Sequence, residues 1–358
     1  MKRVLLVSNY VFHYRQKNYN YFADRFAEEG YEFHVLANEY QDAGYAFHFH
    51  AHTLPFSVKG YERKIEELRP DIVILFLHLK DLIQIPLLHY CKRRHIPVIF
   101  WNKGLSSEDP DNPIKNAFYH HIHNHCDAII TYTPELLRDF QKKNHNKIFI
   151  AYNTVNCSDI DKAKYNRAAI REKYGIKEDK VILYISRMRK DKRIEVLLDA
   201  MANQPNIAVV AMGAGMRPDL QAAFDSAPNL YYLGQKYGEE GLEVWAIGDV
   251  FSVPVNVGLG VNEAIFWGMP IVTMQGKQAP EIYFLKDGQT GFITANEAAY
   301  KEKLLSLLSD AKELARMKAE CEREYEQEVS IERMFQGFLD AVHFCEKLLL
   351  RKGYVQST

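Results

Sequence analysis

The segment NVGLGVNEAIFWGMP, residues 256–270, decides how this chain is interpreted. It follows the apolar run DVFSVP and contains two glycines, Gly258 and Gly260, before an apolar helical stretch. This order of strand, glycine loop and helix places free backbone N–H groups and the positive end of a helix at the carboxyl edge of a sheet. Anions bind at that edge in open α/β folds, and glycine lets the backbone approach a phosphate closely.

The segment does not match a dinucleotide-binding fingerprint. That fingerprint needs G-x-G-x-x-G after the first strand of a βαβ unit, and Glu263 occupies the position of the third glycine. Glu263 lies in the predicted first helical turn. There it either accepts hydrogen bonds from sugar hydroxyls next to a phosphate or only complements the helix dipole. Spacing alone leaves both interpretations open.

A second feature in the same half of the chain supports an anion site. After the run VILYIS come five cations within seven residues: Arg187, Arg189, Lys190, Lys192 and Arg193. A run of charge is usually a solvated loop. This run, however, follows a strand as the glycine loop does. The two features together therefore predict a diphosphate site in which cations and amides hold the anion.

The chain alternates short apolar runs with helical stretches in two series. The first series contains VLLVSN, YEFHVLA, FHFHAH, DIVILFLHL, PVIFWN, DAIITYT and KIFIAYN, and the second contains VILYIS, IAVVAMG, NLYYLG, DVFSVP and PIVTM. Such alternation is typical of parallel sheets covered by helices, and 358 residues exceed the size of about 250–300 residues at which single cores stop growing. We therefore expect two doubly wound Rossmann-like α/β domains, residues 1–157 and 158–330, followed by a helical segment, residues 331–358, capped by Ser330.

Composition excludes several other classes of protein. The formal net charge of −1 gives no bulk attraction to nucleic acid, so no nucleic-acid partner is expected. The five cysteines lack C-x-x-C spacing, as in reduced cytosolic proteins. The first apolar run is too short for a signal peptide or a spanning helix. We expect a cytoplasmic protein, and we leave open a peripheral contact of Lys92, Arg93 and Arg94 with the inner membrane leaflet.

Several segments resemble the retaining GT4 glycosyltransferases, which have the GT-B fold. They are SRMRKDKR, IEVLLDAM, VVAMGAG, the block from GLGVNEAIFWGMP to QTGFI, and the linker AYNTVN, and the resemblance covers most of residues 150–340. It implies two Rossmann-like domains that face a central cleft, with the C-terminal helix crossing back to the first domain. It also implies that Arg187 and Lys192 hold the nucleotide diphosphate and that Glu263 holds the ribose hydroxyls.

The predicted site extends beyond these three catalytic candidates. The remaining donor-binding candidates are Gly213, Lys236, Tyr237, Asn256, Gly258, Leu259, Gly260, Val261 and Asn262. The acceptor-binding candidates are Asn9, Tyr10, Tyr14 and Lys103, and Lys103 stands where the family often has a histidine. Two positions depart from the family. Val255 replaces the first of two glutamates that commonly lie eight positions apart, as in a branch of bacterial polysaccharide transferases, and Arg193 replaces a glycine.

The resemblance implies a hexosyl- or N-acetylhexosaminyltransferase of retaining mechanism. It would move a sugar from a nucleotide-diphosphate sugar, with UDP favoured, to a hydroxyl of a glycan or lipid-linked acceptor in cell-surface polysaccharide synthesis. We expect metal-independent transfer without a cofactor. Two alternatives stay open: a nucleotide-sugar epimerase of the GT-B fold, and a non-catalytic nucleotide-sugar-binding protein, which the loss of the acid at Val255 would fit.

Two groups of histidines in the first half could suggest a metal. HHIHNHC offers His121 and His125 at helical spacing beside Cys126, and FHFHAH places alternate histidines on one face of a strand. No carboxylate completes the first group. We interpret both groups as surface features and expect no metal site.

Overall fold

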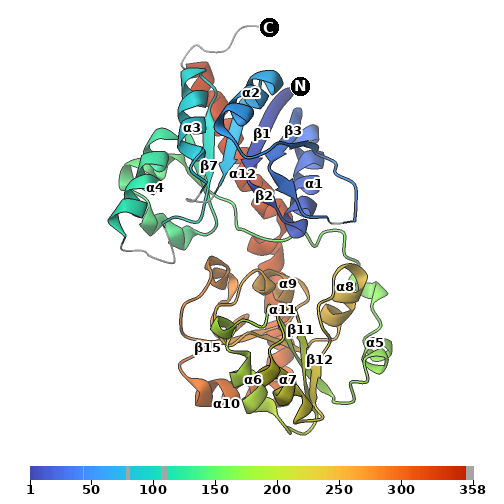
Figure 1. Ribbon diagram of the computed structural model, residues 1–358. Coiled ribbons are helices and arrows are strands. Elements are labelled where there is room, and N and C mark those ends of the chain that lie inside the picture. Colours follow the sequence, from blue (N-terminus) through green and yellow to red (C-terminus); the bar gives the residue numbers. More distant parts are fainter. Residues whose placement is uncertain (43, 78–80, 106–111, 352–358) are drawn as a thin grey trace. The chain divides into compact units, whose positions relative to one another are not determined.

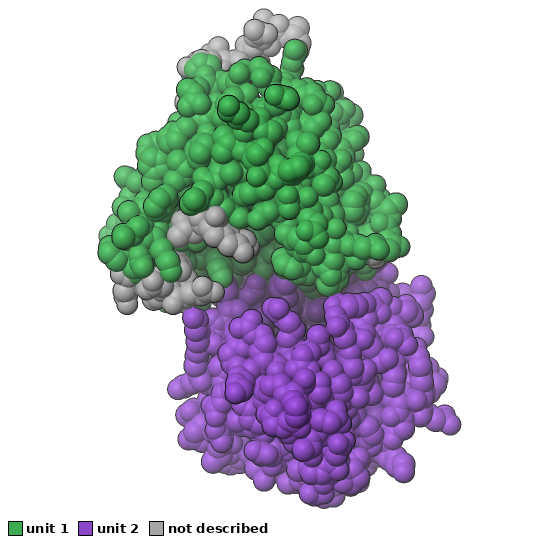
Figure 2. Space-filling model, viewed as in Figure 1, with its two compact units in different colours: residues 1–156, 330–358 green, residues 157–329 purple. Residues whose placement is uncertain are grey.

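The computed structural model describes residues 1–42, 44–77, 81–105 and 112–351, and it divides into two compact units. Unit 1 contains residues 1–156 together with the segment from residue 330 onward, and unit 2 contains residues 157–329 (Figure 2). Residues 352–358 of the predicted C-terminal helical segment lie outside the described residues.

Unit 1 is built on a parallel sheet with the strand order β5-β3-β1-β6-β7-β8-β9. The strands are β1 (Lys2–Ser8), β3 (Tyr31–Ala37), β5 (His50–Thr53), β6 (Ile72–Phe76), β7 (Val98–Trp101), β8 (Ala128–Thr131) and β9 (Ile148–Ile150), and a separate short pair is formed by β2 (Tyr10–Val11) and β4 (Glu39–Tyr40). The helices are α1 (His13–Glu28), α2 (Val58–Leu68), α3 (Gln84–Arg93), α4 (Pro113–His125), two 3₁₀ segments at Pro134–Asp139 and Lys142–Lys147, and α12 (Ile331–Arg351) (Figure 1).

The central strands of unit 1 are apolar on both faces because each face is covered. In β1, Val4 and Leu6 belong to one hydrophobic cluster, whereas Leu5 and Val7 belong to another. This follows from the alternation of side chains along a strand. The first cluster includes α12, whose Phe338 ring lies 4.8 Å from the Phe22 ring of α1. The last helix of the chain is therefore part of the core of unit 1.

Unit 2 has a parallel sheet with the strand order β12-β11-β10-β13-β14-β15. The strands are β10 (Lys180–Ile185), β11 (Ile207–Met212), β12 (Leu230–Tyr232), β13 (Val250–Ser252), β14 (Ile271–Met274) and β15 (Gly291–Thr294). The helices are α5 (Arg167–Lys173), α6 (Ile194–Met201), α7 (Pro218–Asp225), α8 (Gly238–Ala246), α9 (Gly260–Phe266), α10 (Glu297–Ser309) and α11 (Ala311–Glu324), with 3₁₀ segments at Lys162–Lys164, Lys190–Lys192 and Pro280–Phe284 and a π-helical turn at Tyr325–Val329.

Each sheet has a switch point, the place where the order of strand addition reverses. It lies between β1 and β6 in unit 1 and between β10 and β13 in unit 2. Loops that follow the two strands at a switch point diverge and leave a crevice at the carboxyl edge, where ligands bind in open α/β sheets. The α/β fold class predicted from the sequence is confirmed, and the fold itself directs attention to these two edges.

Several element boundaries differ from the sequence prediction. The apolar helical pattern of the sequence predicts a helix only from Tyr19, whereas α1 begins at His13 and polar residues of its first turns are buried. The FHFHAH run forms a strand only over its last part, as β5, and the predicted cap of the last helix is present as a 3.4 Å hydrogen bond from the Arg333 N–H to Ser330 Oγ.

Candidate functional site

Three loops meet at the carboxyl edge of the unit 2 sheet, around its switch point. The basic segment, residues 187–193, follows β10, and the glycine segment, residues 256–260, follows β13. A further glycine turn, residues 213–215, follows β11. β10 pairs directly with both β11 and β13, so the three loops leave adjacent strands. The structure therefore brings the two features that the sequence singled out to neighbouring positions.

Lys192 connects the basic segment to the glycine segment. Its Nζ donates a hydrogen bond to the main-chain oxygen of Asn256, and the Asn256 amide donates to Asp191 Oδ2 at 2.8 Å. Burial lowers the pKa of Lys192; the carboxylate of Asp191 opposes this shift, and the guanidinium charges of Arg189 and Arg187 add to it. A half-buried ammonium among other cations is a favourable place for an anion.

The basic segment is only partly neutralised by its own acid. Arg189 pairs with Asp191 at 2.8 Å, and this pairing helps to lower the pKa of the Asp191 carboxyl group. Arg187 is exposed at the end of β10 and close enough to Lys192 to affect its pKa. Arg193 pairs with Glu297 instead and has φ 53°, the left-handed conformation that glycine adopts most easily. The left-handed conformation of Arg193 explains why glycine is common at this position in the proteins that the sequence resembles.

The glycine segment contains main-chain amides without an internal partner among the described residues. Within the described chain, the N–H groups of Gly258, Leu259 and Gly260 have no hydrogen-bond acceptor, as expected at the start of a helix. A Cβ at Gly258 would meet no atom within 4 Å, whereas one at Gly260 would come within 2.7 Å of the Phe251 ring. Packing therefore explains Gly260 but not Gly258. A small residue at Gly258 keeps the adjacent space available to a ligand.

The turn after β11 requires glycine for a different reason. Gly213 has φ 149°, and a Cβ there would lie 2.0 Å from the main-chain oxygen of Ser186. Gly213 N–H donates to Gly234 at 2.9 Å, and Met188 N–H donates to Ala214 at 2.8 Å. The turn that contains the predicted donor residue Gly213 thus packs closely against the start of the basic segment, and its next residue, Ala214, accepts the Met188 N–H.

The other predicted donor residues divide into near and distant ones. Val261, Asn262 and Glu263 lie in the first turn of α9; the first two are buried and Glu263 is partly exposed. Lys236 and Tyr237 follow β12, which is separated from β13 by two strands. Lys236 pairs with Glu240 at 3.3 Å and lies over the Tyr174 ring. These two residues share the edge but not the switch point.

Two residues that sequence reasoning missed hold the glycine segment. Gln278 Oε1 accepts the Val257 N–H at 2.8 Å, and Asp191 accepts the Asn256 amide. Val255, at the position of the missing acid, lies against Gly276: a Cβ on that glycine would be 3.2 Å from Val255 Cγ1. In the sequence, Asp191 could be noticed only as an acid inside a basic run, and no feature of the sequence pointed to Gln278.

The acceptor candidates of unit 1 lie at the carboxyl edge of its sheet. Asn9 directly follows β1, Tyr10 lies in β2, Tyr14 in the first turn of α1, and Lys103 follows β7 and is exposed. Asn9 Nδ2 donates to Asp81 Oδ1 at 2.9 Å, which joins the segments after β1 and β6 across the switch point. Lys103 is two strands away from β1.

The histidine groups do not form a metal cluster in the described part of the chain. The His121 and His125 rings are tilted by 32° with centroids 4.2 Å apart, and His89 Nε2 lies 3.0 Å from His121 Nε2. Cys126 is buried and donates instead to the His123 oxygen. Over the described residues, no group of three or more His, Cys, Asp or Glu side chains is arranged to hold a metal ion.

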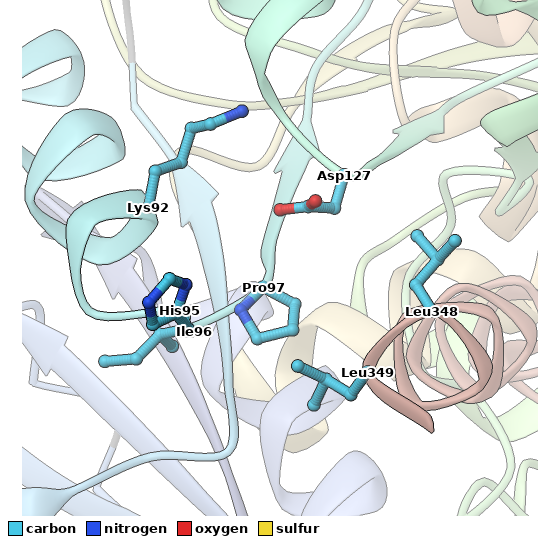
Figure 3. A pocket seen from close by; sticks show the side chains of 7 residues that line it. All are labelled: Lys92, His95, Ile96, Pro97, Asp127, Leu348 and Leu349. Atoms are coloured by element: carbon cyan, nitrogen blue, oxygen red, sulfur yellow. The ribbon is translucent and has the colours of Figure 1, made fainter. Parts of the chain in front are cut away.

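Each unit contains a cavity lined by described residues. A cavity of about 190 Å³ in unit 1 is lined by Lys92, His95, Ile96, Pro97, Asp127, Leu348 and Leu349, and Figure 3 shows these side chains around it. It lies at the amino ends of β7 and β8, away from the acceptor candidates. A second cavity of about 440 Å³ in unit 2 lies where β14 and β15 end, and Arg193 contributes to its wall. The second cavity borders the basic segment.

Comparison with known proteins gives a consistent family. Residues 166–323 match the family model "Glycosyl transferases group 1", and residues 19–159 match "Glycosyltransferase Family 4". The sulfoquinovosyl transferase SQD2 of Arabidopsis thaliana is 30% identical over 129 residues, which are 35% of this chain and 25% of that protein. The N-acetyl-alpha-D-glucosaminyl L-malate synthase of Bacillus anthracis is 26% identical over 181 residues, 46% of each. The matches thus span less than half of these relatives.

Solved structures share the fold at low sequence identity. HepE of Anabaena, crystallised with UDP, superposes with a TM-score of 0.76 at 13% identity, covering 96% of this chain and 100% of that chain. The sucrose-phosphate synthase of Thermosynechococcus elongatus superposes with a TM-score of 0.73 at 15% identity, covering 98% and 100%. At this identity the likeness establishes the fold.

Proposed function

Because the chain belongs to the GT4-type glycosyltransferases of the GT-B fold, we propose that it transfers a sugar from a nucleotide-diphosphate sugar to an acceptor hydroxyl. The observation that supports this most is the connection of Lys192 to the glycine segment at the switch point of unit 2. A half-buried ammonium, an exposed guanidinium and main-chain amides without an acceptor among the described residues follow the two adjacent strands at this switch point. This set of groups suits a diphosphate.

In the proposed mechanism, Arg187, Lys192 and the amides at Gly258–Gly260 stabilise the diphosphate as it leaves. The donor diphosphate replaces the Asn256 oxygen as the partner of the Lys192 ammonium. The acceptor oxygen forms its bond to the anomeric carbon on the face from which the phosphate oxygen departs, so the configuration is retained. The acceptor proton passes to the departing phosphate. Hydrogen-bond donors that are already oriented toward the charge forming in the transition state usually lower the barrier of such a step more than any other single effect.

The remaining donor contacts follow from position. Glu263 would accept hydrogen bonds from the ribose hydroxyls, because it lies one helical turn from the phosphate-binding amides. With valine at 255, contacts to the donor sugar would come from main-chain amides or from Asn256. A UDP-sugar is the favoured donor, and a structural neighbour of this chain was crystallised with UDP-glucose. Whether hexose or N-acetylhexosamine is transferred depends on these contacts.

The acceptor and the setting belong to the same proposal. Unit 1 would bind a glycan or a lipid-linked acceptor through Asn9, Tyr10, Tyr14 and Lys103, in the synthesis of cell-surface polysaccharide. In the described chain, none of the helices combines the length and apolar character needed to span a bilayer. We propose a cytoplasmic location with peripheral contact at the inner leaflet through Lys92, Arg93 and Arg94, which sedimentation with anionic liposomes at low salt would test.

Ligand-induced thermal stabilisation tests the donor assignment. Nucleotide binding at about 100 times Kd should add about 2.7 kcal/mol of stability. UDP, GDP, ADP and their sugar conjugates are compared on the wild type, Arg187→Ala and, as a matched control, Lys190→Ala, an exposed cation of the same segment. One nucleotide series should raise Tm in the wild type and in Lys190→Ala but not in Arg187→Ala. Equal shifts in all three proteins would contradict the assignment.

We also propose that transfer needs no metal and no cofactor, since cations and amides of the chain can balance the diphosphate charge. Activity should then persist in EDTA, and its loss on chelation, with recovery on adding Mg²⁺, would overturn this part of the proposal.

One observation favours a second candidate. Val255 is packed against Gly276, so no carboxylate is available at the family's position for the donor sugar. A protein that binds the nucleotide sugar without transferring it would tolerate that loss. Multiple turnovers separate an enzyme from such a binding protein, and dependence on an acceptor separates a transferase from an epimerase.

A further inference from the structure

Three aromatic side chains follow β1 at the switch point of unit 1, and we call Tyr10, Phe12 and Tyr14 the aromatic wall. The Tyr10 and Phe12 rings meet edge to face with centroids 4.7 Å apart. The Phe12 and Tyr14 rings are stacked at 5.7 Å with an interplanar angle of 11°. The three rings therefore support one another in a preformed arrangement.

Phe12 occupies a helix-capping position that a polar residue would serve better. It is the N-cap of α1, makes no side-chain capping hydrogen bond, and is 44% exposed. Ser, Thr, Asp and Asn are favoured at this position because their side chains accept hydrogen bonds from the first helical amides. An exposed ring in place of a capping residue makes the folded protein less stable. Residues that serve binding often have such a cost in stability.

A fixed polar group lies beside the wall. The main-chain oxygen of Asn9 accepts N–H bonds from Asn38 at 2.9 Å and Glu39 at 3.2 Å, and its side-chain amide donates to Asp81 at 2.9 Å. Asp81 is 3% exposed, so it holds Asn9 rather than meeting a ligand itself. A carboxamide has two N–H donors and one oxygen. In the described chain only one of these donors is engaged, so Asn9 can still bond to a ligand.

The aromatic wall and the neighbouring Asn9 amide together favour a particular class of ligand. The faces of aromatic rings are electron-rich and attract weakly positive C–H groups. A pyranose offers such a C–H face together with hydroxyls that both donate and accept hydrogen bonds. We propose that unit 1 recognises its acceptor as a neutral sugar ring that lies on the aromatic wall, with hydroxyls bonded to Asn9. This rests on the proposed function and specifies the acceptor class within it.

Direct binding of small sugars tests the inference without any need for turnover. Saturation-transfer NMR would be recorded on the full chain with methyl pyranosides of glucose, galactose, mannose, rhamnose and N-acetylglucosamine, and with L-malate and sn-glycerol 3-phosphate as anionic rivals. At least one pyranoside should receive saturation on one C–H face, and the anions should not. If no pyranoside binds, or only the anions bind, the inference is overturned.

The key variant is Phe12→Ser, which removes the ring but installs a favoured capping residue. Its Tm should not fall, whereas its affinity for the pyranoside should drop about tenfold, as for the loss of one stacking contact. Phe118→Ser is the matched control, because Phe118 is 39% exposed on α4, the helix that follows β7. Equal affinities of Phe12→Ser and the wild type would overturn the assignment.

Asp81 is assigned as a positioning residue, and its variants separate that role from folding. Asp81→Ala should weaken pyranoside binding, and Asp81→Asn, which keeps an oxygen for the Asn9 amide, should restore it. Nucleotide stabilisation measured on the same samples reports on unit 2 alone. If a pyranoside binds in a Phe12-dependent way but no nucleotide binds, only the proposed function is contradicted. If a nucleotide binds but no pyranoside does, only this inference is contradicted.

Discussion

Single backbone positions carry much of the site. Arg193 adopts φ 53°, a conformation that costs a residue with a Cβ roughly 1–2 kcal/mol. Arg193→Gly and Arg193→Ala both lose the pair with Glu297, but only glycine relieves the strain. We expect the glycine variant to be more stable than the alanine variant by about 1 kcal/mol in urea denaturation. If Arg193→Ala were as stable as Arg193→Gly or more stable, the backbone at this position would not be strained.

Two glycines of the site should respond differently to alanine. A Cβ on Gly213 would clash with the Ser186 oxygen at 2.0 Å, so Gly213→Ala should lower Tm and nucleotide affinity together. A Cβ on Gly258 would enter open space, so Gly258→Ala should keep the wild-type Tm and lose nucleotide affinity by about tenfold or more. Calorimetric titration and thermal unfolding of both variants give the comparison. Unchanged affinity in Gly258→Ala would place the phosphate elsewhere.

At the scale of elements, α4 carries a buried histidine that makes the fold sensitive to acid. Burial lowers the pKa of His123 to about 3, and neither ring nitrogen has a partner in the described chain. The unfolded chain takes up the proton near pH 6.5. Stability from the neutral ring is therefore complete above that pH and is lost as pH falls toward the folded pKa.

His123→Phe should remove this dependence, because the ring already packs on Phe140 at 4.7 Å. The variant should gain about 1–3 kcal/mol from the absence of unpaired buried nitrogens, and its advantage should grow between pH 8 and pH 5. Urea denaturation at both values measures it. An advantage that stays constant with pH would show that His123 is not titrated in this way.

The elements themselves were largely predictable from sequence, because short apolar runs such as VLLVSN and VILYIS, rich in β-branched residues and alternating with helical stretches, are typical of buried strands in a covered sheet. The start of α1 was not. Arg15 and Asn18 are buried, and they hold the chain at Asn153 and Thr154 through hydrogen bonds of 2.7 and 2.8 Å. Such long-range polar contacts leave no periodic signal, so the first turns of α1 resembled a loop.

The site was predictable in the same uneven way. The basic segment and the glycine segment could be identified because each follows a strand and has a distinctive composition. Asp191 and Gln278 could not, since their role depends on a main-chain conformation, φ 56° at Asn256, that a single sequence does not reveal. Lys236 and Tyr237, which are also predicted donor-binding residues, follow β12 and lie farther along the edge than the residues of the glycine segment.

At the scale of the whole molecule, the described chain builds one large parallel sheet in each unit, each with a switch point, and returns to unit 1 with α12. The formal net charge of −1 provides no general attraction for an anion, so the few cations at the switch point of unit 2 must select the diphosphate. Recognition of the diphosphate in the proposed function therefore depends mainly on Lys192 and Arg187.

The most direct test is a time course of nucleoside diphosphate release from the nucleotide sugar that stabilises the protein. We expect many equivalents to be released per protein and the release to increase with a neutral pyranoside acceptor. In Lys192→Ala the rate should fall by two or more orders of magnitude, which corresponds to about 2.7 kcal/mol or more of transition-state stabilisation. Stoichiometric binding without release, or near-normal rates in Lys192→Ala, would contradict the proposed function.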